Sequence, residues 1–351
     1  TWSQTNFNPA ILGKVGLGSS WSIYKVKYHP TIPNLVFVGT SDGLYRSSDN
    51  LVTWSRVITG QINQIDFHPT NPNIMYVYDT YYWGSNQNKI LTSTNAGLTF
   101  TSSTDIAGNG NANIYISLSS DCPSCVYVAS TNGIWISTDT AKNFNLLGTS
   151  SESCLGFSVN DNDTSNMIYG YVDVDRSVDG GRSWTDATRW SLGSTNGAGS
   201  GNQVSYNTST NYVHADLQQA INVDGVFYVV TDGTISKSND RGISWKNIGQ
   251  GLGIRMNYKL GVSQSNHYRA ICGSQDNGTS IKHKDTWIEF YGADGMESLI
   301  HPLNDDWMVG SVQYGARIGT KNGGQTLSFN PRPSGESGSG KAFWEAPYAY
   351  D

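Results

Sequence analysis

The feature that most constrains the fold is an eight-residue pattern, S-x-D-x-G-x-[S/T]-W, which recurs along the chain. Its best copies are SVDGGRSW at 177–184 and SNDRGISW at 238–245. Looser copies change the aspartate, the glycine or the final aromatic residue, and they occupy 47–54, 93–100, 137–144 and 320–327. Most copies lie about 40 to 46 residues apart, which is the length of one supersecondary unit in a repeat protein.

Each copy follows two short apolar-alternating segments that flank a turn, as in LVFVGTSDGLYRS at 35–47. A second motif begins with His-Pro (HPTIPN at 29–34, HPTNPN at 68–73, HPLNDD at 301–306) and marks an earlier turn of the same unit. Alternation with a period of two predicts strands, and a repeat of this length fits four of them. The sequence therefore predicts an all-β fold, a β-propeller of about seven, or eight, four-stranded blades, with a degenerate blade end at Trp287.

One domain is expected, a single propeller over residues 1–351. The interval before Trp245 is longer than the others, and the Gly/Ser/Asn-rich stretch 192–212 supplies an insertion there. The last segment, FWEAPYAYD at 343–351, has the character of the first strand of another blade. We therefore expect either that the native chain continues past Asp351 or that this strand closes the ring against the N-terminus, which removes free sheet edges.

The repeated pattern has turn chemistry. Aspartate and glycine are the residues that a tight turn needs, one for a side-chain hydrogen bond and one for a positive φ, and the aromatic residue packs into the blade. We assign this structural role to Asp49, Trp54, Asp139, Asp179, Gly181, Trp184, Asp240, Gly242 and Trp245.

Composition excludes several classes of partner. Charged residues are 14% of the chain and the net charge is −6, which gives no reason to expect nucleic acid. No apolar run is long enough to span a bilayer, so membrane insertion is not expected. Cys122 and Cys125 are separated by Pro-Ser and precede a strand-like segment, which favours a small loop disulfide over a redox or zinc site, with free thiols as the alternative.

The repeated turn is similar to the Asp-box of sialidases, xyloglucanases and sortilin-type propellers. From His214 the resemblance becomes more specific: the run HADLQQAINVDGVFYVVTDGTISKSNDRGISW, followed by MNYKLGVS, GSQDNGT, GADGMES and GSVQYG, resembles exported BNR-repeat proteins with a sortilin-like propeller. Many of those are substrates of the Bacteroidetes type IX secretion system. The resemblance implies an extracellular or cell-surface location. Family members often carry a second histidine soon after the HAD triplet, where this chain has Leu-Gln-Gln.

Catalysis would need paired carboxylates. Sialidase chemistry also requires three arginines that bind the carboxylate of the substrate. The chain has no Arg-Ile-Pro motif near its N-terminus, which argues against a sialidase. Hydrolysis of a neutral β-glucan is the better enzymatic hypothesis, since glycosidases need two carboxylates about 5 to 9.5 Å apart. The candidates are Asp216, with Asp232 or Asp294 as its partner, and Asp276. The alternative is that these residues only form turns, as Asp-Gly pairs do.

Binding is the hypothesis that the residues favour. Aromatic side chains beside amides and hydroxyls stack on sugar rings and also enrich protein interfaces. The candidate ligand-binding residues are Tyr81, Tyr82, Trp83, Trp190 and His214. Alternate pairs on one expected strand face, Asp173 with Asp175 and His214 with Asp216, would allow a structural calcium ion. A solvated strand face or a hydrogen-bonded turn is the favoured explanation for both pairs, and no metal site or cofactor is predicted.

These features together predict a secreted or cell-surface propeller that binds glycan or an extracellular protein, as the non-catalytic part of a larger, adhesin-like assembly. The first alternative is a secreted, xyloglucanase-like glycoside hydrolase. The second is a purely structural spacer, which would need neither paired carboxylates nor an aromatic concave surface.

Overall fold

The computed structural model describes residues 22–79, 89–103, 106, 114–130, 132–149, 153–192, 210–249, 251–253, 255–328 and 343–347. The chain divides into two compact units. Unit 1 comprises 1–187, 217–229 and 237–244, and unit 2 comprises 188–216, 230–236 and 245–351. Each unit is described by itself.

The described residues form seven antiparallel sheets, six with four strands and one with three, in which consecutive strands are neighbours. This confirms the predicted multi-blade, all-β propeller. Unit 1 contains four whole sheets: β1 (Ile23–Tyr28), β2 (Val36–Thr40), β3 (Gly43–Ser47) and β4 (Ser55–Thr59); β5 (Ile62–Phe67), β6 (Met75–Asp79), β7 (Lys89–Ser93) and β8 (Thr101–Ser102); β9 (Tyr115–Ser117), β10 (Val126–Ser130), β11 (Gly133–Ser137) and β12 (Asn145–Gly148); and β13 (Gly156–Val159), β14 (Met167–Gly170), β15 (Val174–Ser177) and β16 (Thr185–Asp186).

Unit 2 contains two whole sheets. They are β21 (Asn257–Val262), β22 (Arg269–Ser274), β23 (Gly278–His283) and β24 (Thr286–Tyr291), and β25 (Gly295–Ile300), β26 (Met308–Val312) and β27 (Ala316–Thr320). One further sheet has its residues divided between the two units, and consists of β17 (Leu217–Val223), β18 (Val226–Thr231), β19 (Ile235–Ser238) and β20 (Lys246–Asn247). The helices among the described residues are two single turns of 3₁₀ type, η1 (Trp190–Leu192) and η2 (Gln313–Gly315).

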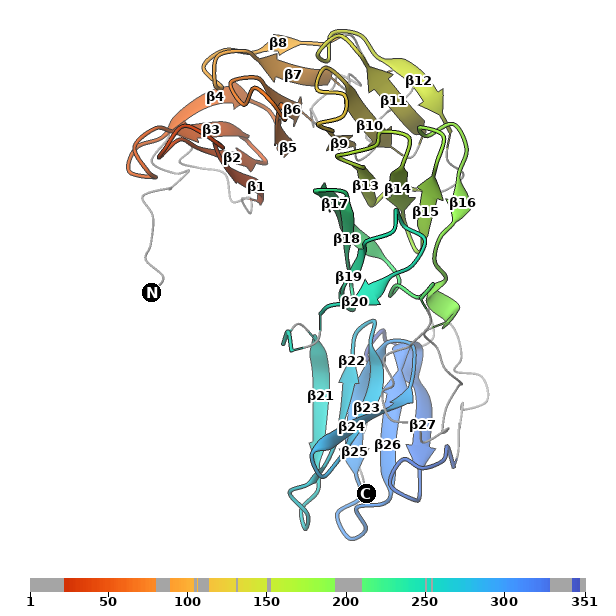
Figure 1. The fold of residues 1–351 in the computed structure, drawn as a ribbon. Coiled ribbons are helices and arrows are strands. Elements are labelled where there is room, and N and C mark those ends of the chain that lie inside the picture. The colour runs from red at the N-terminus through yellow and green to blue at the C-terminus, as the bar shows by residue number, and fades with distance from the viewer. Residues whose placement is uncertain are drawn as a thin grey trace. The chain divides into compact units, whose positions relative to one another are not determined.

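The first strand of each blade in unit 1 lies beside the first strand of the next blade. Contacts join β1 to β5, β5 to β9, β9 to β13 and β13 to β17. Figure 1 shows these first strands on the inner side of unit 1, with β4, β8, β12 and β16 on the outer side. Side chains on the inner strands therefore converge on a shared space, and this arrangement positions the cavity described below.

The core lies between the faces of neighbouring sheets. Phe37 and Leu44 of the first blade pack against Ile62, Ile65 and Met75 of the second, all at 1% exposure or less. Equivalent clusters join the second blade to the third, the third to the fourth and, in unit 2, the sheet of β21–β24 to that of β25–β27. Because the middle strands are covered on both faces, they are nearly continuous apolar runs, such as VFVGT and MYVYD.

The repeated eight-residue pattern forms the same hydrogen-bonded turn at every copy. In the copy at 177–184, Ser177 Oγ donates to Asp179 Oδ1 (2.8 Å) and accepts the N–H of Gly181 (2.8 Å), while Asp179 Oδ1 accepts the N–H of Ser183 (2.9 Å). The exposed hydroxyl of Ser183 donates to Asp179 Oδ2 (2.6 Å). These bonds hold the pKa of the Asp179 carboxyl below its usual value, with the Ser183 hydroxyl as the largest cause.

The turn keeps its backbone geometry where its glycine is missing. Two consecutive residues adopt positive φ, as in Gly180 (74°) and Gly181 (86°). In the copy at 47–54 these positions are Asn50 (56°) and Leu51 (73°), with no glycine at all. The serine still accepts the backbone N–H there, from Leu51 at 2.9 Å. The serine and the Asp/Asn side chain therefore specify this turn, and glycine only removes its strain.

The earlier turn of each blade is capped by a side-chain acceptor at the end of the first strand. His29 Nδ1 accepts the N–H groups of Thr31 (3.2 Å) and Ile32 (3.0 Å), and His68 has the same role in the second blade. In the third blade Ser119 Oγ accepts the N–H of Asp121 (3.2 Å), and the following turn is closed by a disulfide between Cys122 and Cys125. This is the loop disulfide favoured from the sequence, while Cys154 and Cys272 are free and buried.

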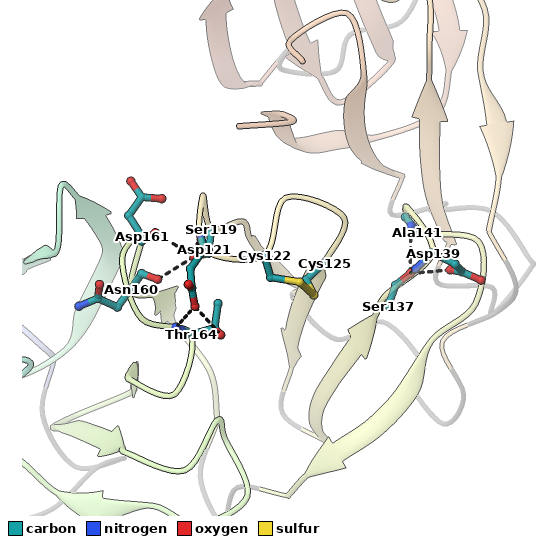
Figure 2. Close-up of a disulfide and its surroundings, with 10 residues drawn as sticks. All are labelled: Ser119, Asp121, Cys122, Cys125, Ser137, Asp139, Ala141, Asn160, Asp161 and Thr164. Carbon is teal, nitrogen blue, oxygen red and sulfur yellow. Dashed lines mark hydrogen bonds between the residues drawn. A yellow bond between two sulfur atoms is a disulfide. The ribbon is translucent and has the colours of Figure 1, made fainter. Parts of the chain in front are cut away.

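The disulfide turn lies where the third blade meets the fourth (Figure 2). Asp121 Oδ2 accepts both the N–H and the hydroxyl of Thr164, each at 3.0 Å, and the N–H of Asp121 donates to the carbonyl of Asp161 (3.0 Å). Ser119 Oγ also donates to the carbonyl of Asn160 at 2.8 Å. The disulfide therefore stiffens a segment that joins two blades by polar contacts.

Two expectations about strand faces are wrong. Strand β17 begins at Leu217, so His214 and Asp216 lie in the preceding loop, with Asp216 at a φ of 61°. Strand β15 begins at Val174, which leaves Asp173 in the turn before it. A backbone that turns within the pair removes the alternation on which a shared strand face depends.

Candidate functional sites

The four aspartates singled out from the sequence all belong to unit 2 and all lie in turns. Asp216 precedes β17, Asp232 lies between β18 and β19, Asp276 lies between β22 and β23, and Asp294 precedes β25. We call these four residues the aspartate cluster. Each aspartate lies in a connection between strands, and hydrogen bonds join these connections.

Hydrogen bonds join the turns of the aspartate cluster. A carboxylate oxygen of Asp294 accepts the N–H of Asp276 (2.9 Å), and the N–H of Asp294 donates to Gln313 Oε1 (3.3 Å). The N–H of Asp232 donates to the carbonyl of Asp216 at 3.2 Å. The four aspartates therefore take part in holding neighbouring turns through these bonds.

Burial and, after it, the neighbouring negative charges raise the pKa values of two aspartates in the cluster. Burial is the largest cause for Asp276, and a hydrogen bond and charge repulsion from Asp294 add to it, which raises the pKa of Asp276 to about 6. Burial, followed by the charge of Asp232, raises the pKa of Asp216, against the opposing effect of His214. Asp276 is therefore partly protonated near pH 6, as a general acid must be.

His214 lies at the centre of these turns. Its Nε2 is 2.9 Å from the carbonyl oxygen of Asp276, and its Nδ1 is 3.1 Å from the carbonyl oxygen of Ala215. A Cβ on Gly233 would lie 2.2 Å from the His214 ring, so only glycine fits beneath the imidazole. Both ring nitrogens are thus used within the protein, which argues against His214 as a ligand-binding residue.

Metal ligation has no geometric support among the described residues, where no group of three or more His, Cys, Asp or Glu side chains is placed to hold an ion. Of the aromatic residues predicted to bind ligand, Trp190 lies in η1 and is 49% exposed. Tyr81, Tyr82 and Trp83 lie outside the described residues.

Unit 1 contains a cavity of about 330 Å³ that the sequence did not indicate. It is bounded by the inner strands β1, β5, β9, β13 and β17, and we call it the inner-strand cavity. Four side-chain amides contribute to its polar lining, those of Asn63 and Gln64 from β5 and of Gln218 and Gln219 from β17. The sequence signal is the pair of adjacent amides in two inner strands, which periodicity alone does not distinguish from solvent-facing polar residues.

Aromatic and charged residues complete the lining. Tyr24, Tyr115 and Phe157 supply ring surfaces, and Lys25, Lys27 and Asp66 supply charge. Lys27 Nζ lies 3.4 Å from Asp66 Oδ1. Burial raises the pKa of Asp66, against the opposing charges of Lys27 and Lys25. Asp66 is the cavity's only lining carboxylate among the described residues, and its partner is a lysine.

Comparison with known proteins supports the fold. No protein-family model and no curated protein sequence matches the chain. The structure is similar to the GH74 enzyme of Niastella koreensis, with 17% identity, 88% of this chain and 53% of that chain covered, and a TM-score of 0.51. It is also similar to the GH74 xyloglucanase of Xanthomonas campestris, with 13% identity, 89% and 52% covered, and a TM-score of 0.61.

A third similar structure is YCF48 bound to D1 peptide, with 11% identity, 91% and 95% covered, and a TM-score of 0.44. The chain spans about half of the length of the two GH74 structures. Identities this low show the β-propeller fold alone. Within the described residues, no helical segment has the length and apolar character needed to cross a bilayer.

Proposed function

We propose that this chain is a carbohydrate-binding β-propeller and that the inner-strand cavity is its sugar site. The observation that carries the proposal is the lining of that cavity, in which side-chain amides of Asn63, Gln64 and Gln219 stand beside Tyr24 and Tyr115. An amide offers two donor hydrogens and an acceptor oxygen, which matches neighbouring sugar hydroxyls, and an aromatic ring stacks on the apolar face of a sugar. The volume suits a few sugar rings at most.

Binding is favoured over hydrolysis at this cavity because of its carboxylates. A glycosidase needs two, one on each side of the scissile bond. Asp66 stands alone in the described lining and is paired with Lys27. A polar site with one neutralised carboxylate can hold a sugar and has no acid–base pair with which to cleave it.

An extracellular location belongs to the same proposal. The disulfide between Cys122 and Cys125 supports it, because structural disulfides persist in oxidising compartments. The resemblance of residues from His214 onward to exported BNR-repeat proteins supports it independently of the disulfide. We propose on these grounds that the chain works at the cell surface or in the medium, as the glycan-binding part of a larger assembly.

The test is calorimetric titration of the chain with a panel of neutral and acidic oligosaccharides. We expect Gln64→Ala and Gln219→Ala each to weaken binding about two- to tenfold, since each removes hydrogen bonds to the ligand. Gln264→Ala, at an exposed glutamine of unit 2, is the matched control and should bind as the wild type does. Failure of every oligosaccharide to bind would refute the proposal.

A second candidate function is hydrolysis of a neutral β-glucan by the aspartate cluster. The raised pKa of Asp276, about 6, favours it, because a general acid must hold a proton at working pH. Against it, a carboxylate oxygen of Asp294 accepts the backbone N–H of Asp276 (2.9 Å), so this carboxylate already holds the neighbouring connection. Chromatography of the titrated oligosaccharides separates the two candidates, since cleavage products would favour the hydrolase.

A further inference from the structure

The inner-strand cavity has an unbalanced charge. Two lysines and one aspartate line it, and Lys27 forms the ion pair with Asp66. Within the described part of the chain, Lys25 has neither a hydrogen bond nor an ion pair of its own. Burial lowers the pKa of Lys25, and the like charge of Lys27 lowers it further, against the attraction of Asp66. The cavity therefore contains the partly desolvated ammonium group of Lys25, whose positive charge Asp66 does not fully neutralise.

A second lining group lacks a partner. The Oδ1 atom of Asn63 is buried and accepts no hydrogen bond from the described residues. A buried acceptor without a donor is destabilising, by an amount similar to a lost hydrogen bond. Asn63 and Lys25 line the same cavity, on the adjacent strands β5 and β1. A ligand that satisfies both residues needs a hydroxyl that donates to Asn63 Oδ1 and an anionic group that accepts from the Lys25 ammonium group.

We propose that the inner-strand cavity selects a saccharide that carries a carboxylate, a uronic acid, and that the Lys25 ammonium group binds this carboxylate. The inference rests on the proposed function, because it names the class of sugar for the same cavity. A uronic acid brings hydroxyl donors for Asn63 Oδ1 and an anion for Lys25 on one ring. A neutral sugar leaves the ammonium group with water only, in a place where charge is costly to hold unpaired.

Charge-assisted hydrogen bonds are about twice as strong as neutral ones, so the carboxylate should dominate selectivity. The pair of Lys27 and Asp66 limits the site to one anion, since it neutralises the second lysine. A polyanion such as a nucleic acid strand would need more positive charge than this single lysine. These charges favour a single uronate ring over a neutral sugar and over a polyanion.

The experiment compares three probes on the full chain by calorimetric titration: galacturonic acid, its methyl ester and acetate. The ester keeps the sugar and removes the charge, while acetate keeps the charge and removes the sugar. We expect the acid to bind about tenfold or more tightly than the ester, and acetate to bind too weakly to measure. Lys25→Met should abolish the preference for the acid and leave the affinity for the ester within about twofold.

Lys246→Met, at an exposed lysine outside the cavity, is the matched control and should keep the preference. Equal binding of acid and ester by the wild type would overturn the uronate inference while the sugar-binding proposal stands. Binding of acetate as tightly as the acid would overturn it in favour of a simple anion site. If neither the acid, the ester nor any neutral oligosaccharide binds, the proposed function itself fails.

Discussion

Replacing Ser177 by alanine tests the claim that the serine of the repeated pattern holds its turn. Ser177 is 1% exposed, and its Oγ accepts the N–H of Gly181 at 2.8 Å. Alanine leaves that N–H without an acceptor. Water cannot replace the hydroxyl easily, because Leu147 Cδ2 and Met167 Sδ lie only 3.1 Å from the position of a Cβ on Gly181. A buried, unpaired N–H costs about 1–3 kcal/mol, so we expect the free energy of unfolding to fall by that amount.

The assay is urea unfolding followed by tryptophan fluorescence, with a thermal scan beside it. A loss of this size lowers Tm by about 2–4 °C per kcal/mol in a unit of 150–250 residues. Ser183→Ala is the matched control, because it removes a hydroxyl from the same aspartate at an exposed position, where water can replace it. We expect a change within about 0.5 kcal/mol for that variant. Equal losses in the two variants would refute the reasoning that burial of the Gly181 N–H sets the cost.

Two further perturbations test the aspartate cluster and the disulfide. The folded-state pKa of Asp276, about 6, lies above the unfolded value near 3.9, so the folded chain binds more protons between them and stability falls as pH rises through that window. Asp276→Asn should flatten that part of the pH–stability profile measured by thermal unfolding, and an unchanged slope would contradict the raised pKa. Replacing Cys122 and Cys125 by serine opens a four-residue loop, for which chain entropy predicts a loss of about 2 kcal/mol in urea unfolding. A much larger loss would mean that the disulfide also determines the contacts of Asp121 with Thr164.

The blades could be predicted from the sequence because their information is local. A serine and an aspartate two residues apart stabilise a turn without distant residues, as in the hydrogen bond that Ser47 Oγ donates to Asp49 Oδ1 (2.9 Å). The apolar runs before each turn also indicate their strands without reference to distant residues. Leu51 at a φ of 73° could not be predicted, since leucine seldom adopts that geometry and only the neighbouring hydrogen bonds impose it.

The inner-strand cavity could not be predicted because it depends on residues far apart in the chain. Lys25 and Gln219 line the same cavity because the inner strands pack side by side, and no local pattern relates these two residues. The amides of an inner strand also look like ordinary solvent-facing residues in a period of two. Prediction from sequence favoured the aromatic loop at 81–83 and the aspartates instead, because turn residues and exposed rings are conspicuous in a sequence.

In the aspartate cluster, His214 contacts the carbonyl oxygen of Asp276, a residue 62 positions away in sequence. His214 faces a carbonyl oxygen at each ring nitrogen, and carbonyl oxygens only accept. The ring therefore bridges the backbone beside Asp216 and the backbone of Asp276. Burial is the largest cause of the raised pKa of the Asp216 carboxyl, and His214 opposes that rise. The cluster is therefore organised as a tie between neighbouring connections, through the contact of His214 with the Asp276 carbonyl and the bond from the Asp276 N–H to Asp294, and this arrangement accounts for its aspartates without a sugar between them.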